Sequence, residues 1–407
     1  MPAVPSILWI LTTQWRAQSC GYAGDANART PHLDTLAAQS RQFTAAITPH
    51  PFGPFARAAI LTGVPCPQNG VREYYDPLPR EATTAAHFFR ARGYATAWIG
   101  KWHLARRDPS APLIGEPHAR MVVAPEDRGG FEHWEGFESG FLLNDPWLHG
   151  SGHGEPTRFP GYQSDVLVDR TLLYLAGRTA GLSPIAEDPG GQRDPRRPWF
   201  CILSLEAPHP PYAAPAAGIA PPAPESLVLP ANVPRGGEVE TQARRELSGY
   251  YAHLEATDRA LGRLIAALPP NVRVVFTSVH GDMHGAHGLF RKGWPHEESV
   301  RVPLLIRDPV LPPERITRPV SLLQLRELSL DPTAIAAGPV HCSMPSVVNL
   351  PHQCDRAWTG LRTATRKWVF AADGQPWLGF DLASDPSEIR NWTVETVAEL
   401  PLTSRST

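Results

Sequence analysis

The chain has 407 residues, of which 42% are apolar, and a formal net charge of −2. This length allows one large domain with an appendage, or two domains, around a sizeable buried core. The nearly balanced charge gives no reason to expect nucleic acid or an anionic membrane as a partner.

The apolar runs and the cysteines bear on where the protein works. The first twenty residues hold one short apolar run, residues 7–11, without a basic segment before it, and no later run reaches the length of a membrane span. The five cysteines are widely spaced and include no C-x-x-C pair, which is typical of reduced thiols. We therefore expect a soluble, cytoplasmic protein.

The first predicted element is a buried strand. Residues 6–12 are SILWILT, an apolar run that ends in a polar residue, as is typical of a parallel strand covered on both faces. Functional side chains in open α/β sheets follow the carboxyl ends of such strands. Thr12 and Thr13 stand at that end, followed by Gln14, Trp15 and Arg16.

Residues 50–63, HPFGPFARAAILTG, are the most distinctive stretch. Prolines and a glycine at 51–54 are expected to prevent a helix there, and residues 55–62 then predict a short apolar helix that ends at Gly63. Arg57 would lie in its first turn, where backbone N–H groups, the helix dipole and a guanidinium favour an anion such as sulfate, phosphate or carboxylate. Taken alone, the stretch could equally be a tight turn into a buried helix.

Three later apolar runs, at residues 94–99, 199–205 and 272–277, also predict buried strands followed by polar residues. The side chains after these strands include Lys101, His103, His209 and His280, with Lys292 a little further on. Predicted helices at 82–92, 162–175 and 238–268 separate the strands. Because carboxyl ends of parallel strands meet at one edge of a sheet, we expect these side chains to gather in one site.

A series of blocks resembles the type I sulfatases of the alkaline phosphatase superfamily, whose signature is C-x-P-x-R followed by A-S-L-L-T-G. The matching blocks are QWR (14–16), TPHLD (30–34), RAAILTG (57–63), GKWHL (100–104), PHPPY (208–212), FTSVHGD (276–282), GLFRKG (288–293), EESVRVPL (297–304) and DLASDPSEIRN (381–391). They cover nearly the whole chain. The resemblance implies an α/β fold: a large, mostly parallel sheet between helices to residue 340, and a small C-terminal antiparallel sheet plus helix in residues 341–407.

The resemblance also implies roles for individual residues. Arg57, Lys101 and Lys292 match the positions that bind the sulfate group. His103, His209 and His280 match active-site positions of the family. Three cations and three histidines would then share one pocket, and we expect nothing to neutralise them except an anionic ligand.

Other family positions have changed. The cysteine that is oxidised to the formylglycine nucleophile falls on Gly53, and the metal-binding aspartates fall on Thr12, Thr13 and Val279, so that only His280 is kept. Glycine has no side chain to act as a nucleophile. Ca2+ and Mg2+, which the family uses, need several oxygen ligands, usually carboxylates. We therefore expect no metal and no other cofactor.

Three functions fit these residues. The first is binding of a small-molecule sulfate ester, phosphate ester or similar anion without the family's standard chemistry. The second is an active sulfuric or phosphoric ester hydrolase rebuilt around His280, Asp282, His284 and His287, which could hold Zn2+ or supply a general base. The third is a structural or partner-binding role with a vestigial pocket.

Overall fold

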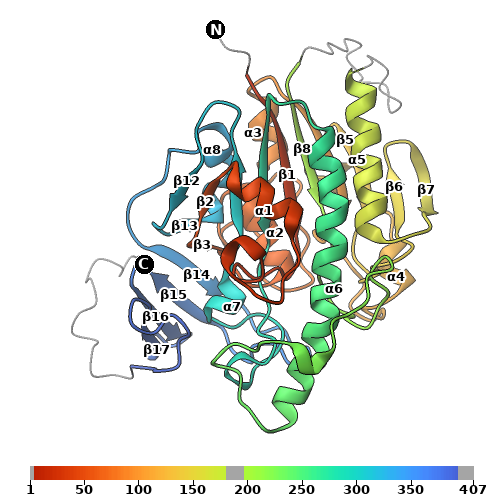
Figure 1. Ribbon diagram of the computed structural model, residues 1–407. Coiled ribbons are helices and arrows are strands. Elements are labelled where there is room, and N and C mark those ends of the chain that lie inside the picture. Colours follow the sequence, from red (N-terminus) through yellow and green to blue (C-terminus); the bar gives the residue numbers. More distant parts are fainter. Residues whose placement is uncertain (1–3, 180–196, 393–407) are drawn as a thin grey trace.

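The computed structural model describes residues 4–179 and 197–392. A ten-stranded sheet with the order β12-β2-β11-β9-β1-β8-β4-β5-β6-β7 runs through the molecule (Figure 1). Its strands are β1 (Ser6–Thr12), β2 (Arg41–Phe43), β4 (Ala95–Lys101), β5 (His133–Phe137), β6 (Trp147–Gly150), β7 (His153–Arg158), β8 (Trp199–Ser204), β9 (Val272–Ser278), β11 (Leu304–Arg307) and β12 (Glu314–Ile316).

The five central strands, β9, β1, β8, β4 and β5, are parallel, which confirms the predicted fold class. Strand β1 lies in the middle and buries both faces. Ile7, Trp9 and Leu11 belong to one hydrophobic cluster, whereas Leu8 and Ile10 belong to another on the opposite side. This alternation explains why the strand is a continuous apolar run in the sequence.

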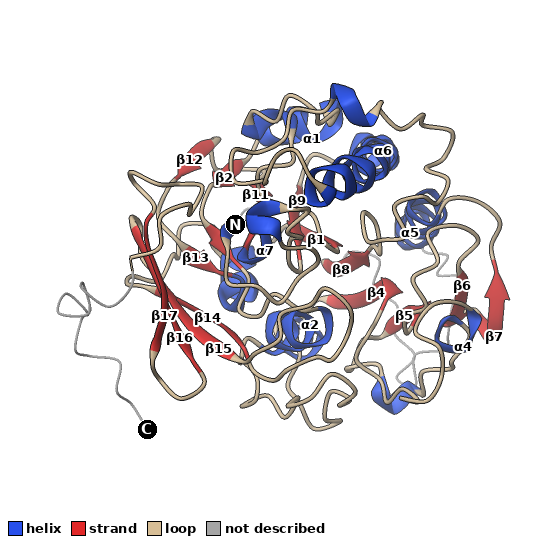
Figure 2. Ribbon diagram, turned by 90° about the horizontal axis from the view of Figure 1, so that it is seen from below, coloured by secondary structure: helices blue, strands red, loops and turns tan. Residues whose placement is uncertain are grey.

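Helices cover the two faces of the sheet (Figure 2). On one face lie α1 (Pro31–Ala38), α5 (Gln163–Thr179) and α6 (Glu238–Ala267), and on the other α2 (Gly53–Thr62), α3 (Ala85–Arg90) and α8 (Leu325–Leu330). Shorter helical turns are α4 (Glu116–Ala119), α7 (Glu297–Val300) and 3-10 turns at Gly21–Ala23, Pro125–Asp127, Pro224–Ser226, Ala286–Gly288 and Leu322–Gln324. The sandwich of helices around a sheet is the architecture that the sequence predicts.

Two smaller sheets complete the fold. One joins β3 (Ala46–Ile47), β10 (Arg301–Val302) and β13 (Val320–Ser321); the other is antiparallel and consists of β14 (Val340–Met344), β15 (Trp358–Arg362), β16 (Arg366–Ala371) and β17 (Pro376–Asp381). The antiparallel sheet is the predicted C-terminal one. The helix expected with it is not found between residues 341 and 392, the part of that region which the structure describes. The domain boundary at residue 340 stays a prediction.

Helix α2 begins earlier than the sequence suggested. It starts at Gly53 and not at residue 55, because Pro54 occupies one of the first helical positions, where a missing N–H costs nothing. Gly63 ends it in the left-handed conformation, with φ of 67°, and donates its N–H to the Ala59 carbonyl. Arg57 is therefore the fifth residue of the helix. It was expected in the first turn but lies beyond it.

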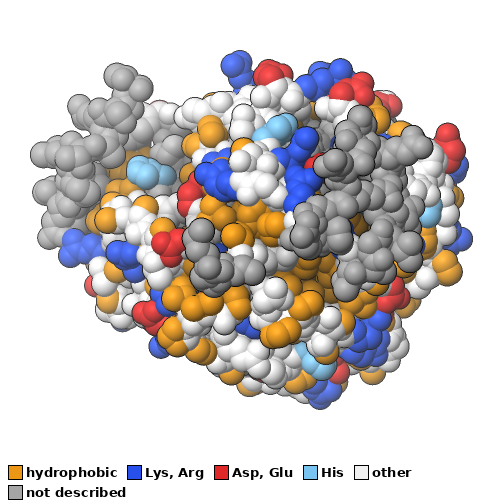
Figure 3. All heavy atoms as spheres, turned by 90° about the horizontal axis from the view of Figure 1, so that it is seen from above, with side chains coloured by type: hydrophobic (Ala, Val, Ile, Leu, Met, Phe, Trp, Pro, Cys, Tyr) orange, Lys and Arg blue, Asp and Glu red, His pale blue; other side chains and the backbone are white. Residues whose placement is uncertain are grey.

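No helix in the described parts of the chain is long and apolar enough to cross a membrane. Basic and acidic side chains are interspersed over the face shown in Figure 3, in keeping with the nearly balanced charge. The cytoplasmic location stays a prediction.

Helix α6 packs closely on the loop after β8. A Cβ added at Gly249, in the middle of α6, would overlap the carbonyl oxygen of Tyr212. We expect Gly249→Ala to lower the free energy of unfolding by about 1–3 kcal/mol, as overpacking does, despite roughly 1 kcal/mol of added helix propensity. Urea unfolding measures the change. Gly154→Ala is the control because a Cβ there meets no atom within 4 Å; a Gly249→Ala protein as stable as this control would contradict the close packing.

Candidate functional site

A cavity of about 610 Å³ lies where β1, β4, β8 and β9 end. This volume is typical of a small-molecule site. The residues that follow these strands line it together: Thr13 after β1, Lys101 and His103 at the end of β4, His209 after β8 and His280 after β9. Lys292 and Gly53 also line it. The structure thus brings together most of the residues that the sequence singled out.

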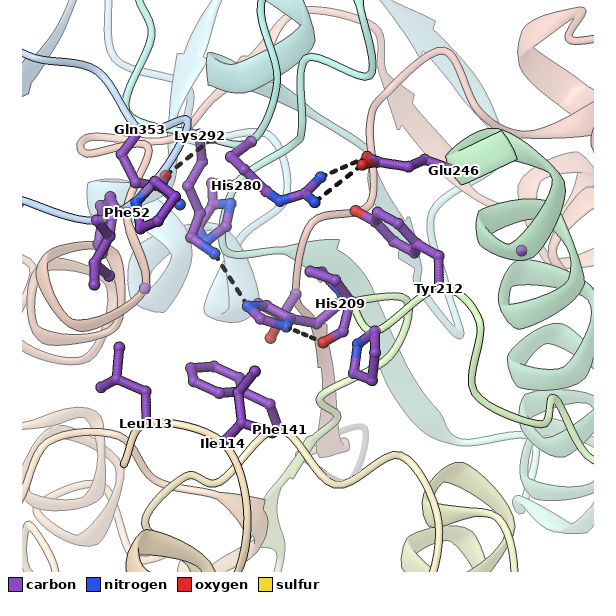
Figure 4. A pocket seen from close by; sticks show the side chains of 18 of the residues that line it. Phe52, Leu113, Ile114, Phe141, His209, Tyr212, Glu246, His280, Lys292 and Gln353 are labelled. Atoms are coloured by element: carbon purple, nitrogen blue, oxygen red, sulfur yellow. Dashed lines mark hydrogen bonds and ion pairs between the residues drawn. The ribbon is translucent and has the colours of Figure 1, made fainter. Parts of the chain in front are cut away.

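Aromatic and aliphatic side chains form much of the wall. Phe52 and Gln353 lie on one side of the cavity, and Leu113, Ile114 and Phe141 lie on another (Figure 4). The Phe141 ring stacks on His209 with 4.4 Å between centroids, and Lys101 Nζ lies 4.6 Å from the centre of the same ring. A mostly apolar wall around a few charged groups strengthens every electrostatic interaction inside it.

Lys101 has a carboxylate partner that the sequence analysis did not identify. Its Nζ pairs with Glu206, and both side chains are buried. Burial lowers the pKa of Lys101 to about 8, and the neighbouring Glu206 carboxylate opposes the fall. Glu206 stands two residues after the end of β8 and shortly before the block that holds His209, so its position near a strand end was the available signal.

Arg57 lies beneath the cavity and is absent from its lining. Its guanidinium donates to the Lys101 carbonyl at 3.1 Å and to Ser204 Oγ at 2.6 Å. A third bond, of 3.0 Å, reaches Thr13 Oγ1. Arg57 therefore joins the ends of β1, β4 and β8. The sequence predicted that its guanidinium would face an anionic ligand, and this prediction is wrong. Burial lowers the pKa of Arg57 to about 10.

Lys292 has no carboxylate partner in the described parts of the chain. Its Nζ donates to Gln14 Oε1 at 2.6 Å and lies 3.0 Å from His209 Nε2. Both partners are uncharged, since burial and nearby cations hold the pKa of His209 well below its usual value. Burial lowers the pKa of Lys292 to about 7. Lys292 is thus the lysine of the cavity without a direct carboxylate partner, although the nearby Asp282 carboxylate opposes the fall in its pKa.

Hydrogen bonds fix the tautomers of the three histidines, because arginine only donates and carbonyl oxygens only accept. His103 Nε2 accepts from Arg107 at 3.0 Å, so its Nδ1 carries the proton. His209 Nδ1 donates to the Pro210 carbonyl at 2.7 Å, and His280 Nδ1 donates to the Gly281 carbonyl at 2.8 Å. Burial holds the pKa of each imidazole well below its ordinary value. All three are neutral at pH 7.

The space beside Gly53 is filled by His103. A Cβ built on Gly53 would lie 3.0 Å from His103 Nδ1 and 3.2 Å from its Cε1. His103 Nδ1 is buried and has no hydrogen-bond partner. A larger side chain at position 53 would have to displace this ring.

The positions that the resemblance assigns to a metal do not fit a hard divalent cation. Thr12 Oγ1 donates to the Thr277 carbonyl at 3.2 Å, and Thr13 Oγ1 donates to the Leu205 carbonyl at 3.0 Å. Val279 is fully buried and aliphatic. The donor set is reduced to two neutral hydroxyls, already used by the backbone, and one imidazole, whereas Ca2+ and Mg2+ need several oxygen ligands.

Buried carboxylates neutralise much of the site, which corrects the expectation that only a ligand could. Besides Glu206, Glu138 lies 3.4 Å from Arg107 and accepts the backbone N–H groups of residues 104 and 105. Burial raises the pKa of Glu138 to about 7. Asp282 accepts from Gln14 and from the Tyr212 hydroxyl, at 2.7 Å. Of these, Glu138 also follows a strand, β5, and could have been identified by that position.

The four residues of the rebuilt-hydrolase alternative do not form one set of ligands. His280 lines the cavity, whereas Asp282, His284 and His287 are absent from its lining. The three-residue group in the described chain whose ligand atoms come within 4.8 Å of one another is His287, His296 and Glu388. The two imidazole rings stack, with 4.1 Å between their centroids and 19° between their planes. Their nitrogen lone pairs therefore lie in nearly parallel planes and do not point at one ion. Lys367 Nζ already lies 2.6 Å from Glu388.

Comparisons with known proteins show the family of this chain. The family model described as Sulfatase matches residues 5–331. An ulvan-active sulfatase from Formosa agariphila is 36% identical over 319 residues, which are 76% of this chain but 57% of that protein's length. A choline-sulfatase from Rhizobium meliloti is 27% identical, over 95% of this chain and 82% of its own.

Solved structures share the fold. The crystal structure of yidJ from Bacteroides fragilis has a TM-score of 0.79 at 24% identity and covers 95% of this chain and 91% of its own. The phosphonate monoester hydrolase of Agrobacterium radiobacter has a TM-score of 0.68 at 20% identity, with the same coverage of 95% and 91%.

The Lys101–Glu206 pair yields a stability prediction. We expect Glu206→Gln to lower the free energy of unfolding by about 3–5 kcal/mol, because it leaves the Lys101 ammonium buried without its counter-charge. Chemical denaturation measures this loss. Glu116→Gln removes a carboxylate from an exposed pair with Arg120, at 3.3 Å, and should change stability little. Equal effects of the two substitutions would show that the buried pair does not need its charge.

Proposed function

Because this chain belongs to the sulfatase family, we propose that its cavity binds a small-molecule sulfate ester, phosphate ester or similar anion, without the formylglycine- and metal-dependent hydrolysis of that family. The proposed ligand is a small molecule, and the proposed site needs no resident metal or other cofactor. The name of the Formosa relative refers to ulvan, but this chain spans little more than half of that protein.

The observation that carries the proposal is the contact between Gly53 and His103. The resemblance to the family's signature puts its nucleophile at position 53, which bears no side chain here, and the His103 ring lies where a side chain would project. Covalent catalysis needs a group with a lone pair at the reacting centre. The aliphatic and hydroxyl side chains at positions 12, 13 and 279 support the same conclusion, because they offer a divalent cation no carboxylate.

Anion binding rests on the charge of Lys292. Lys101 is balanced by Glu206, whereas Lys292 lacks a carboxylate in the described chain and has a direct path to the cavity. When protonated, Lys292 places a positive charge without a direct carboxylate partner at largely apolar walls, where a bound anion relieves its electrostatic cost. Lys101 lies at the same cavity and adds attraction at longer range.

The proposal predicts that Lys292→Met weakens anion binding. Without the ammonium, we expect the association constants of phosphate, sulfate and 4-nitrophenyl sulfate to fall at least about tenfold, the loss typical of a charged hydrogen bond. Isothermal calorimetry at pH 6.5 measures them. Arg120→Gln removes an exposed cation outside the cavity and is the control.

Two results would contradict the proposal. Unchanged binding by Lys292→Met would show that the cavity lysine does not hold the anion. Steady hydrolysis of 4-nitrophenyl sulfate or 4-nitrophenyl phosphate by the wild-type protein, lost in Lys292→Met, would show that the chain is an active hydrolase.

The proposal also predicts how binding depends on pH. The pKa of Lys292 is about 7 in the empty cavity, and a bound anion should raise it. Binding above pH 7 then takes up a proton, so the association constant should be level below pH 7 and fall by up to about tenfold per pH unit above it. Calorimetry in buffers of different ionisation enthalpy measures this uptake. A pH-independent affinity between pH 6 and 9 would exclude Lys292 as the binding group.

A further inference from the structure

We propose that Lys292 is a reactive amine that forms a reversible imine with a small aldehyde bound in the cavity. This inference goes beyond the proposed function. Only one part of it, the choice of an anionic aldehyde, rests on that function. The argument uses the position of Lys292, its partners and the walls of the cavity.

Lysine is rare in this chain, and the three lysines differ in their partners. Lys101, Lys292 and Lys367 are the only lysines of the sequence, and all are buried. Lys101 pairs with Glu206, and Lys367 lies within 2.8 Å of Glu297 and 2.6 Å of Glu388. Carboxylates stabilise the ammonium form of these two. Lys292 has two neutral hydrogen-bond partners instead and forms no ion pair in the described chain, although the nearby Asp282 carboxylate favours its ammonium form.

The hydrogen bonds of Lys292 leave its lone pair free. A neutral amine has two N–H groups and one lone pair in a tetrahedral arrangement. Gln14 Oε1, at 2.6 Å, and His209 Nε2, at 3.0 Å, can accept both N–H groups. Lys292 extends into the cavity between His209 and His280 (Figure 4). The third direction at Nζ is therefore available to a ligand in the cavity.

The walls favour the uncharged amine. Phe52, with its ring centre 5.5 Å from Nζ, and the apolar side chains of Leu113 and Ile114 surround the cavity. Burial lowers the pKa of Lys292 to about 7; the Asp282 carboxylate opposes this fall, and the nearby cations Lys101 and Arg291 contribute to it. About half of the Lys292 side chains are then unprotonated at neutral pH, in contrast to roughly one in a thousand for an exposed lysine. Desolvation beside another cation is a known way to make a lysine nucleophilic.

The proposed reaction is balanced without an oxidant or reductant. The Nζ lone pair attacks the carbonyl carbon, a C–N bond forms, and the carbonyl π electrons move to oxygen. That oxygen takes up a proton while Nζ loses one, which gives a carbinolamine; His209 Nε2, 3.0 Å away, can accept the proton in transit. Loss of water then forms the C=N bond. One amine and one aldehyde give one imine and one water.

The cavity indicates the class of aldehyde. Its volume of about 610 Å³ suits a single ring with one or two substituents. The aromatic side chains Phe52 and Phe141 favour an aromatic ring, and Lys101 at the same cavity favours an anionic substituent. We therefore expect a small aromatic aldehyde that bears a phosphate, sulfate or carboxylate group.

The test traps the imine on the full chain. Protein at pH 7.5 is incubated with pyridoxal 5′-phosphate or with pyridoxal, which lacks the phosphate group, then reduced with borohydride, digested and analysed by mass spectrometry. We expect a stable secondary amine on Lys292 and little on Lys101 or Lys367. Arg120→Lys supplies an exposed reference amine directly after α4. Lys292 should react at least about tenfold faster than this amine, since a far larger fraction of Lys292 is unprotonated. In Lys292→Arg, checked for an unchanged melting temperature, the adduct at this position should be absent.

The outcomes separate this inference from the proposed function. An adduct on Lys292 that phosphate suppresses supports both. An adduct that forms equally with both aldehydes and is not suppressed by phosphate supports the imine and contradicts the anion site. If Lys292 is labelled no faster than the reference lysine, the imine proposal is overturned, even where calorimetry shows anion binding.

Discussion

The need of each buried charge for a partner organises this site. Arg57 donates to a carbonyl and two hydroxyl groups at three strand ends, and Lys101 pairs with Glu206. These bonds hold β1, β4 and β8 in register at the edge where the cavity opens. Lys292, like Arg57, has uncharged hydrogen-bond partners, here Gln14 and His209, and the nearby Asp282 carboxylate favours its charged form. Lys292 differs from Arg57 in that it lines the cavity, where a ligand can reach it.

The sequence predicted the framework of the site well, because that framework follows from local patterns. The apolar runs located β1, β4, β8 and β9, and the polar residues after them do meet at one cavity. The start of α2 was wrong by two residues, because a proline tolerated in the first helical turn was treated as a helix breaker.

The partners of the charged groups could not be predicted from the sequence. Lys101 and Glu206 are 105 residues apart, and Lys292 and Gln14 are 278 apart, so no local pattern relates them. Because these partners were not known, the sequence predicted a pocket in which every cation lacks a counter-charge. It did not distinguish Lys292 from Lys101. The fold is that of the sulfatases, but fold alone does not carry chemistry. An amine with a free lone pair and an ammonium that attracts anions are two states of the same side chain, and the pH decides between them.

The most direct test of this account is an NMR titration of the lysine side chains. The sequence has three lysines, so protein labelled with 13C-lysine should give three resolvable Cε signals. The account predicts that the Lys292 signal, assigned by its loss in Lys292→Arg, titrates with a pKa of about 7 and that phosphate raises this pKa. A Lys292 signal that titrates near the ordinary lysine value of about 10.4, and does not respond to phosphate, would contradict the account.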